Sequence, residues 1–345
     1  MTKSTAKSVR RHYVGRFFTL TLILMASASC QRPEPIQLLG QAQGTYYSIQ
    51  YYDKQQRNLQ SKVDSLLQAF DREASLWVDS SLLRRINSNA TDSISPLLAD
   101  LLDKSQWINS YTGGAFDCRI GRIVQAWGFS FKQREELDAK TLAELRKAAS
   151  GRVAVSGDRV VKQYPSTELD FNAIAQGYAV DLLATMFDSL GIENYLIDVG
   201  GEVIGRGGKP DGSPWRVGIE KPAADSSSAP VVQTAIALRN SSVVTSGNYR
   251  KYYERDGVKY SHTIDPSTGR PVQHSLLSVS VVDSTAWLAD AMATAYMVMG
   301  LERSLDFIAA HVSSPGTAAV LFIYDSAGTM CTYATPQFEE LEIKR

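Results

Sequence analysis

Residues 288–300 read LADAMATAYMVMG, an almost wholly apolar run with no Gly or Pro before its last position. Such a run predicts a buried helix that ends at Gly300. Asp290 and Thr294 break the apolar pattern, and because they stand four residues apart, they lie on one face of the helix. A buried carboxylate is costly unless it is paired, hydrogen-bonded or bound to a metal.

Two interpretations of this pair remain open at this point. An Asp carboxylate and a Thr hydroxyl together suit a hard cation that prefers oxygen ligands, such as Mg²⁺. In the structural alternative, Asp290 accepts a hydrogen bond from a neighbouring backbone and Thr294 bonds back to its own helix. The helix alone does not decide between a metal site and a structural role.

The composition is that of an ordinary globular protein of 345 residues, 44% hydrophobic and 21% charged. This length suits one large domain or two closely associated ones. Lys plus Arg and Asp plus Glu number 36 each, so the charge balance gives no case for a nucleic-acid partner. The sequence contains neither a Walker-type phosphate loop nor a zinc-binding pattern, and its His and Cys residues are dispersed.

Residues 1–29 have the layout of an export signal. Basic residues precede an apolar run at 17–28, which is too short and too close to the start for an ordinary membrane span. Small residues then lead into Cys30, although Ser27 stands where Leu is more usual. The pattern resembles a bacterial lipoprotein signal and predicts an exported protein, anchored to a bacterial membrane by a lipidated Cys30 and facing the periplasm. The alternative is an ordinary secretory signal cleaved near the same place.

Three segments are expected after the signal: a tether at 30–40, one domain at 41–330 and a polar C-terminal tail at 331–345. Disulfides are permitted in an exported protein. Cys118 and Cys331 are then the only candidate pair, and the sequence leaves open whether they meet.

Strands and helices alternate irregularly along the domain. Strands are predicted at 44–52 and 195–199, and helices at 58–70 and 95–111. Several consecutive strands follow between 215 and 282. This order favours an α+β fold over a doubly wound parallel sheet.

Two further segments combine glycines with polar residues. Residues 112–117 form a glycine-hinged turn, which lets a backbone approach a ligand, although a plain tight turn fits the spacing equally well. A helix is predicted to open near residue 169 and to run to Leu190, with Asp170 at the position of a helix cap. Gly177 within that helix costs about 1 kcal/mol relative to Ala, so it indicates close packing.

Four separated motifs occur in one order: Gly44-Thr45-x-Tyr47, GGAFD at 113–117, the segment 170–181, and a block at 246–294 that contains HTIDPSTG and ADAMATA. Together they resemble the FAD:protein FMN transferase family, also known as ApbE or flavin-trafficking proteins. The similarity covers about residues 40–325.

The resemblance implies an ApbE-like, T-fold-like α+β architecture with antiparallel sheets and packed helices. It implies a Mg²⁺-dependent enzyme, exported and often a lipoprotein. Such an enzyme cleaves the pyrophosphate of FAD, joins FMN through a phosphoester to a Thr or Ser of a target flavoprotein, and releases AMP. The implied partners are FAD and an exported flavin-acceptor protein, such as a subunit of a membrane redox pump.

The resemblance also assigns site residues. Its metal ligands fall on Asp290, Thr294 and the backbone carbonyl of Ala173. Its flavin contacts and dinucleotide-bordering residues fall on Trp77, Ala115, Phe116, Asp117, Asp170, Gln176, His262 and Ile264. The sequence departs from the family at four positions: Trp287 replaces an acidic ligand of some members, Gln43 a Met, Trp77 a Tyr, and Gln176 a Lys or Glu.

Several roles have alternatives. His262 is a candidate general base for the incoming hydroxyl, because imidazole titrates near neutral pH, but a His beside a turn also serves as a hydrogen-bonding support. Phe116 and Trp77 either stack on rings or fill the core. Three functions remain open: the transferase, an FAD pyrophosphatase that uses water as acceptor, and a lipid-anchored flavin-binding protein without chemistry. The retention of Asp290 and Thr294 favours an enzyme.

Overall fold

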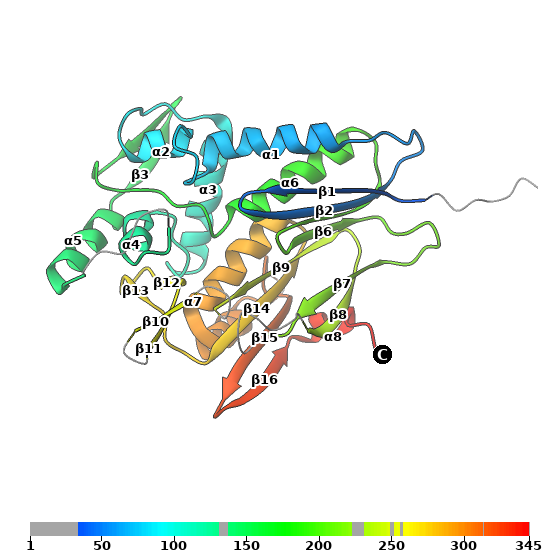
Figure 1. The fold of residues 1–345 in the computed structure, drawn as a ribbon. Coiled ribbons are helices and arrows are strands. Elements are labelled where there is room, and N and C mark those ends of the chain that lie inside the picture. Colours follow the sequence, from blue (N-terminus) through cyan, green and yellow to red (C-terminus); the bar gives the residue numbers. More distant parts are fainter. Residues whose placement is uncertain are drawn as a thin grey trace, which may run out of the picture. The chain divides into compact units, whose positions relative to one another are not determined.

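An antiparallel sheet of eight strands is the frame of this protein (Figure 1). The computed structural model describes residues 34–130, 137–222, 231–248, 252–255, 258–312 and 314–344, and all of them except Glu34 belong to one unit that begins at Pro35. The strand order is β1 (Ile36–Ala42), β2 (Thr45–Tyr52), β5 (Asn194–Val199), β6 (Glu202–Arg206), β9 (Ser241–Gly247), β14 (Leu276–Asp283), β15 (Ala319–Ser326) and β16 (Thr329–Ala334). The strands predicted at 44–52 and 195–199 are confirmed.

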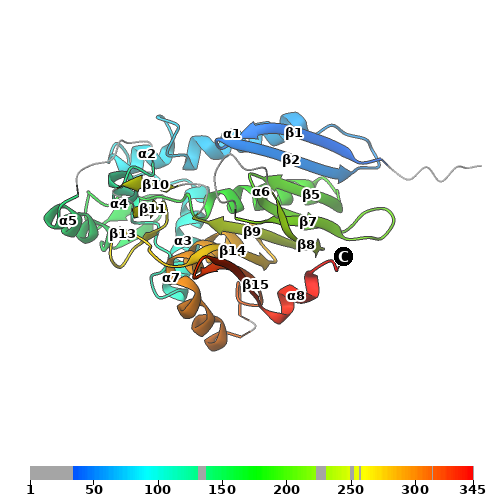
Figure 2. The ribbon, with the colours of Figure 1, turned by 60° about the horizontal axis from the view of Figure 1, so that its bottom comes forward.

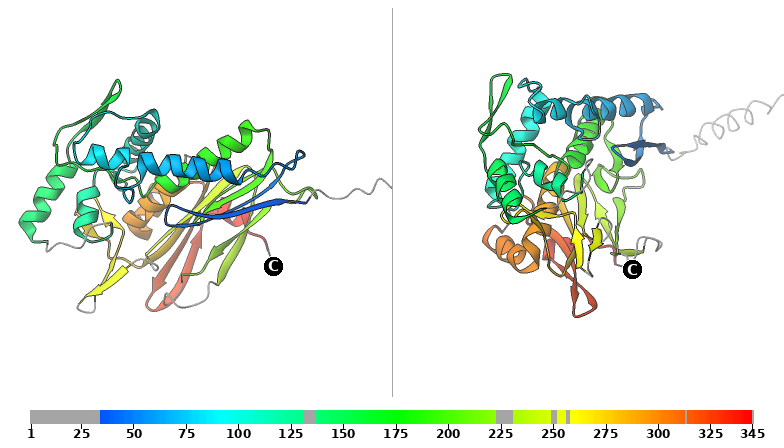
Figure 3. Two further views of the ribbon diagram at one scale, coloured as in Figure 1. Left: turned by 45° about the horizontal axis from the view of Figure 1, so that its top comes forward. Right: turned by 60° about the vertical axis from the view of Figure 1, so that its left-hand side comes forward.

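Three helices cover one face of this sheet (Figures 1 and 3): α1 (Gln60–Ala74), α6 (Ala175–Ser189) and α7 (Ala286–Ala310). Helix α7 contains the apolar run and packs against β9 and β14, and Met292 and Tyr296 within it are fully buried. A helix that is apolar on all sides requires such burial. The chain breaks from helical geometry at Gly300, where φ is 75°, so the predicted helix end is confirmed, and a further helical segment continues to Ala310.

The opposite face of the sheet is covered by a hairpin of β7 (Trp215–Glu220) and β8 (Val232–Leu238) and by α8 (Pro336–Leu341), which lie around the C-terminus in Figure 2. Val243 and Val244 are neighbours in β9, but they join different hydrophobic clusters because successive side chains of a strand point to opposite faces. Phe338 of α8 is fully buried in the cluster on this second face.

Two segment boundaries predicted from the sequence need correction. Residues 36–40, expected to belong to a tether, form most of β1, whose Leu38 is buried against the core. The expected tail at 331–345 contributes to β16 and forms α8. Pairing with β2 orders the first segment, and pairing with β15 orders the second. Their own sequences show little of the pattern that predicts a strand, because strand formation depends on the neighbouring strands. The predicted signal at 1–29 and Cys30 lie outside the described residues.

Smaller elements gather near one end of the sheet (Figures 1 and 2). They are α2 (Leu82–Asn87), α3 (Pro96–Tyr111), α4 (Gly121–Ala126), α5 (Ala139–Ala149), the hairpin of β3 (Val153–Ser156) and β4 (Arg159–Lys162), and the short strands β10 (Tyr252–Arg255), β11 (Val258–Ser261), β12 (Ile264–Asp265) and β13 (Arg270–Pro271). Ser81 and Ser95 cap α2 and α3 by accepting a hydrogen bond from a first-turn N–H. The mixture of helices and antiparallel strands confirms the α+β prediction.

The described residues settle two further points. Cys118 is buried and Cys331 is half-buried, and both are free thiols, so the candidate disulfide is not formed. Among the helices of the described ranges, none is both long and apolar enough to span a bilayer.

Candidate functional site

The N-terminus of α6 is capped by a side chain of α7. The Oδ2 atom of Asp290 accepts a hydrogen bond of 3.0 Å from the N–H of Gly177, the third residue of α6. The N–H groups of a first helical turn have no partner within their own helix. Ile174 stands at the cap position of α6 and has no polar side chain, so Asp290 supplies the acceptor from a helix 113 residues away.

The N-terminus of α7 is capped in turn by a side chain of α6. Asp181 accepts hydrogen bonds from the N–H groups of Ala286 at 3.0 Å and Trp287 at 2.8 Å, the first two residues of α7. Each helix therefore carries the carboxylate that caps the other. We call the set Gly177, Asp181, Ala286, Trp287 and Asp290 the reciprocal cap. Negative charge near a helix N-terminus is favoured by the helix dipole, so both ends stabilise a carboxylate.

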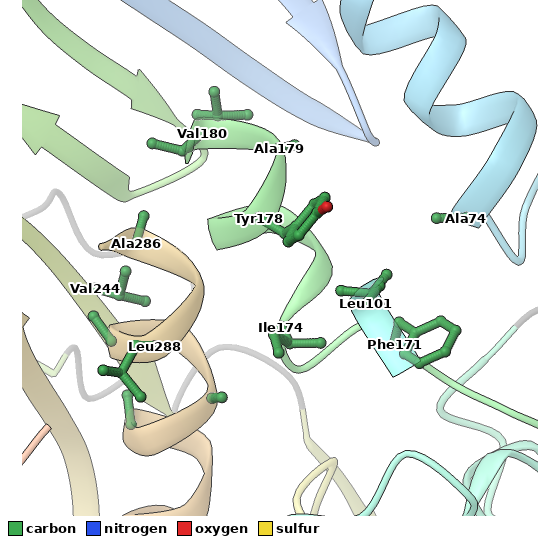
Figure 4. Close-up of a cluster of buried hydrophobic side chains, with 14 of the residues drawn as sticks. Ala74, Leu101, Phe171, Ile174, Tyr178, Ala179, Val180, Val244, Ala286 and Leu288 are labelled. Atoms are coloured by element: carbon green, nitrogen blue, oxygen red, sulfur yellow. The ribbon is translucent and has the colours of Figure 1, made fainter. Parts of the chain in front are cut away.

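The reciprocal cap lies in apolar surroundings. Figure 4 shows α6 beside α7 in a cluster of buried side chains, which includes Ile174, Tyr178 and Val180 from the α6 side and Ala286 and Leu288 from α7. All five are buried.

Gly177 allows the two helices to approach closely. A Cβ atom at this position would lie 2.4 Å from the carbonyl oxygen of Ala286 and 2.8 Å from the Cβ atom of Asp290. Both distances are far shorter than a van der Waals contact. The prediction that Gly177 permits close packing is confirmed.

Burial raises the pKa of both carboxyl groups. The pKa of Asp290 rises to about 7, because burial disfavours its charge and the charge of Asp181 repels it, while the hydrogen bond from Gly177 opposes the rise. The pKa of Asp181 rises to about 6 through burial, against the two backbone hydrogen bonds that it accepts. Within the described ranges, no Lys, Arg or His side chain forms an ion pair with Asp290.

The other predicted oxygen ligands lie on the same helix as Asp290 and just before α6. Thr294 is one turn further along α7, and its Oγ1 lies 3.3 Å from the Oγ of Ser246 on β9. Ala173 is half-buried just before α6 and four residues ahead of Gly177. The described part of the chain contains no cluster of three His, Cys, Asp or Glu side chains that suits a metal. A single carboxylate with hydroxyl and carbonyl oxygens is a donor set for Mg²⁺ rather than for zinc.

Asp170 does not cap α6, which corrects the predicted helix start at residue 169. The helix begins at Ala175, and Asp170 lies in the preceding loop, where its Oδ1 accepts a hydrogen bond of 2.8 Å from the N–H of Asn172. Its own N–H donates to the carbonyl of Cys118 at 2.7 Å. Burial raises the pKa of Asp170 to about 6. The structure thus places this loop directly beside the end of the predicted glycine-hinged turn.

The turn itself is well packed. Ala115 and Phe116 are buried, and Asn109 donates to the Phe116 carbonyl at 2.7 Å. The buried Phe116 ring favours the core role that the sequence left as its alternative. The carboxylate of Asp117 forms an ion pair with Arg119, with donor–acceptor distances of 2.7 and 2.8 Å.

The other predicted residues lie on four different segments. Gln176 is the second residue of α6 and donates from its side chain to the carbonyl of Val199 at 2.8 Å. Trp77, in the loop before α2, is 64% exposed. Ile264 on β12 is buried in a cluster with α4 and α5, and the half-buried His262 lies 6.5 Å from Phe129 between ring centroids.

Sequence reasoning missed Asp181 and Asn87. Asp181 ends one of the four family-like motifs, and a signal was present, since a carboxylate in a largely apolar helix needs a partner. Asn87 ends the short helix α2, and its side chain forms hydrogen bonds with the backbone of a residue 82 positions away. No local sequence pattern predicts such a contact.

Comparison with known proteins gives consistent results. The ApbE family model matches residues 43–321. The FAD:protein FMN transferase of Vibrio cholerae serotype O1 is 35% identical over 328 residues, covering 92% of this chain and 96% of that protein. The FAD:protein FMN transferase of Escherichia coli K12 is 33% identical over 347 residues, covering 93% of this chain and 97% of that protein.

Two solved structures resemble the fold closely. The apo form of the flavinyl transferase ApbE from Pseudomonas stutzeri has a TM-score of 0.78 and 31% sequence identity, covering 90% of this chain and 97% of that one. The flavin transferase ApbE from Vibrio cholerae has a TM-score of 0.77 and 32% identity, covering 89% and 99%.

Proposed function

Because this chain belongs to the ApbE family, we propose that it is a Mg²⁺-dependent transferase that moves FMN from FAD to a Thr or Ser hydroxyl of an acceptor protein. The observation that carries the proposal is the reciprocal cap with its buried Asp290. This carboxylate faces the start of α6, has the Thr294 hydroxyl one turn away on the same helix, and has no ion-pair partner among the described residues.

The transfer makes one bond and breaks one. The acceptor hydroxyl oxygen forms a phosphoester with the phosphorus of the FMN half, and the pyrophosphate P–O bond breaks so that AMP departs with the electron pair. The hydroxyl proton passes to a base, for which His262 is our candidate. Phosphoryl transfer requires mainly positioning and charge neutralisation from the protein.

The metal would be held by Asp290, Thr294 and the carbonyl of Ala173, and these all-oxygen ligands fit Mg²⁺. When bound, the ion neutralises phosphate charge and polarises the phosphorus that is attacked. The chain itself contributes orientation. Asp290 is fixed by its hydrogen bond from Gly177, and the Asp170 loop and the turn at 113–117 are joined through the Cys118 carbonyl.

The flavin is proposed to contact Trp77, Ala115, Phe116, Asp117, Asp170, Gln176 and Ile264. Phe116 and Ile264 are buried and Trp77 is 64% exposed, so Trp77 is our candidate for the ring that stacks on the isoalloxazine.

The proposal includes the location and the acceptor. The lipoprotein-like signal supports export, lipid attachment at Cys30 and a site that faces the periplasm. An exported flavoprotein, such as a subunit of a membrane redox pump, is the proposed acceptor.

The test uses the soluble fragment 31–345, which retains the whole unit that begins at Pro35. The fragment is incubated with FAD, Mg²⁺ and a candidate acceptor domain, and the acceptor's intact mass and free AMP are followed together. We expect a mass gain of one FMN that requires Mg²⁺ and is lost in Asp290→Asn. The matched control is Asp306→Asn, an exposed Asp on the same helix.

The two alternatives give different results in this assay. Release of AMP without a mass gain, equal with and without acceptor, would replace the transferase by an FAD pyrophosphatase. Tight binding of FAD with neither product would leave a flavin-binding protein.

A further inference from the structure

The side chain of Asn87 pairs with a backbone as a neighbouring strand would. Its Nδ2 donates to the carbonyl of Leu169 at 2.8 Å, and its Oδ1 accepts from the N–H of the same residue at 2.8 Å. Asn87 is the last residue of α2 and is buried. An amide with both its donor and its acceptor used on the backbone of one buried residue fixes the position of that backbone. We call these two hydrogen bonds between Asn87 and Leu169 the clamp.

The opposite edge of the same segment is also held by hydrogen bonds. The N–H of Gly121 donates to the carbonyl of Glu168 at 3.1 Å, and the N–H of Asp170 donates to the carbonyl of Cys118 at 2.7 Å. Residues 168–170 therefore lie between two hydrogen-bonding edges, like the central strand of a small sheet. One edge is backbone, and the other is the single side chain of Asn87.

Lys162 forms hydrogen bonds both with the end of α2 and with the residues just before segment 168–170. Its Nζ donates to the carbonyls of Ile86 at 3.0 Å, Thr167 at 3.1 Å and Pro165 at 3.3 Å. These contacts fix α2 relative to the chain just before Glu168. Lys162 therefore fixes the backbone around Asn87, and the Asn87 side chain in turn fixes the backbone of Leu169.

The clamped peptide directly precedes the proposed ligands. Asp170 follows Leu169 in sequence, and the carbonyl of Ala173 is four residues beyond Leu169. Phe171 and Ile174 are buried in the main core, so this loop keeps its apolar anchors even without the clamp. We therefore expect loss of the clamp to change the backbone position of the loop and to leave the fold in place.

We propose that Asn87 is a positioning residue, which sets the register of the 169–173 loop and thereby aims the Asp170 carboxylate and the Ala173 carbonyl at the Mg²⁺ and FAD site. This inference rests on the proposed function for the identity of the ligands. Asn87 itself touches neither ligand, and it acts through the peptide of Leu169.

The test compares Asn87→Asp with Asn89→Asp in fragment 31–345. The first change removes the donor to Leu169 and places a carboxylate oxygen against its carbonyl. Asn89 is exposed, and its side chain donates to the carbonyl of Pro165 at 3.0 Å, outside the clamped peptide. FAD binding is measured by flavin fluorescence across a Mg²⁺ titration, and AMP release is measured separately.

We expect the half-saturating Mg²⁺ concentration to rise about 10-fold or more in Asn87→Asp, as is usual when a residue that orients a metal ligand is changed. Asn89→Asp should keep the wild-type value. A merely structural role is tested with Phe338→Leu, which weakens the cluster on the opposite face of the sheet. That variant should lower the melting temperature without moving the Mg²⁺ response.

The inference is overturned if Asn87→Asp melts at a lower temperature but keeps the wild-type Mg²⁺ and FAD affinities, or if Phe338→Leu shifts them equally. Should Asn87→Asp not fold, Lys162→Met removes the contacts to the carbonyls of Ile86, Asn87, Pro165 and Thr167, which hold the end of α2 beside the segment. This variant should shift the Mg²⁺ response in the same direction. Failure of the proposed function is distinct, since wild-type protein would then bind FAD without transferring FMN, and the binding titration would still test the clamp.

Discussion

Three carboxyl groups around the start of α6 resist ionisation. Burial raises the pKa of Asp170 and Asp181 to about 6 each and that of Asp290 to about 7. Asp181 and Asp290 also disfavour each other's charge. In the metal-free protein these groups carry a free-energy cost when ionised, which a bound cation would offset.

The free-energy cost of ionising these buried carboxyl groups predicts how the free energy of unfolding of the metal-free protein depends on pH. Unfolded Asp ionises near its ordinary value of 3.8, whereas folded Asp290 keeps its proton up to about pH 7. The folded state therefore binds more protons between these values, and the free energy of unfolding should fall as pH rises from about 4 to about 7. We expect Asp290→Asn to flatten this fall by an amount on the order of 2–4 kcal/mol.

Urea unfolding in EDTA at several pH values across this range provides the measurement. Identical slopes for wild type and Asp290→Asn would show that the folded pKa of Asp290 is not raised. Asp306→Asn, on the exposed part of α7, should follow the wild-type slope.

Single residues were predictable where they differ from the apolar pattern of their own helix. Asp290 and Thr294 stand out from an apolar run. Asp290 bonds a neighbouring backbone, as the structural alternative predicts, whereas the Thr294 hydroxyl lies against Ser246 of β9. The metal alternative stays a prediction. The structural alternative for Asp170, a helix cap, was wrong because the helix starts five residues later, and its predicted flavin contact stays a prediction. The partners of Asn87 and Asp181 are 82 and more than 100 residues away, so only the tertiary fold identifies them.

At the level of elements, α6 and α7 cross at Gly177. We expect Gly177→Ala to destabilise the protein by about 1–3 kcal/mol, because its methyl group would overlap the Ala286 carbonyl and force the helices apart. This outcome is opposite to the gain of about 1 kcal/mol that Ala brings to an unhindered helix interior. The same displacement should weaken Mg²⁺ binding, since Asp290 moves with α7.

Thermal and urea unfolding, with a Mg²⁺ titration, measure this effect. The control is Gly218→Ala on β7, where an added Cβ meets Val232 at 3.4 Å, an ordinary contact. A Gly177→Ala protein as stable as wild type would mean that the helices separate at no cost.

Elements were predictable when their pattern was strong. The β-favouring run at 44–52 and the break at Gly300 are local features, and the structure has β2 at Thr45–Tyr52 and a break in α7 at Gly300. The sequence predicts a tether and a tail where β1 and α8 are found, because each element is short and is ordered mainly by the elements beside it.

For the molecule as a whole, both ends of the described chain complete the sheet and its covering layer. Phe338 near the C-terminus is fully buried beneath the sheet. We expect Phe338→Ala to cost about 3–5 kcal/mol of unfolding free energy, the usual range for a large-to-small change in a core. Tyr333→Ala, at a side chain that is 43% exposed, should cost about 1 kcal/mol or less.

Urea denaturation of the two variants measures the difference. Equal and small losses would mean that residues 331–345 behave as the polar tail that the sequence predicts and add little to stability. A stable, fully folded protein ending at Met330 would support the same conclusion.

The thiols give a second whole-molecule prediction. In fragment 31–345, we expect Cys331 to react with a thiol reagent in the folded protein and Cys118 to react only after unfolding. Cys118 is 4% exposed and burial raises its pKa, which removes the reactive thiolate. Peptide mass spectrometry after timed labelling identifies the modified residue, and Cys331→Ser should abolish the fast reaction. Equal labelling of both thiols would contradict this.

The reciprocal cap has a consequence for how the protein is made. Its hydrogen bonds join residues 105, 106 and 113 positions apart, so neither helix end is satisfied until a long loop has closed. A ribosome completes α6 well before α7, and during that interval α6 has an unfinished first turn. Contacts of such separation form slowly, so the ability to bind ligand should be acquired in the last and slowest phase of folding, after the local hairpins and helices exist.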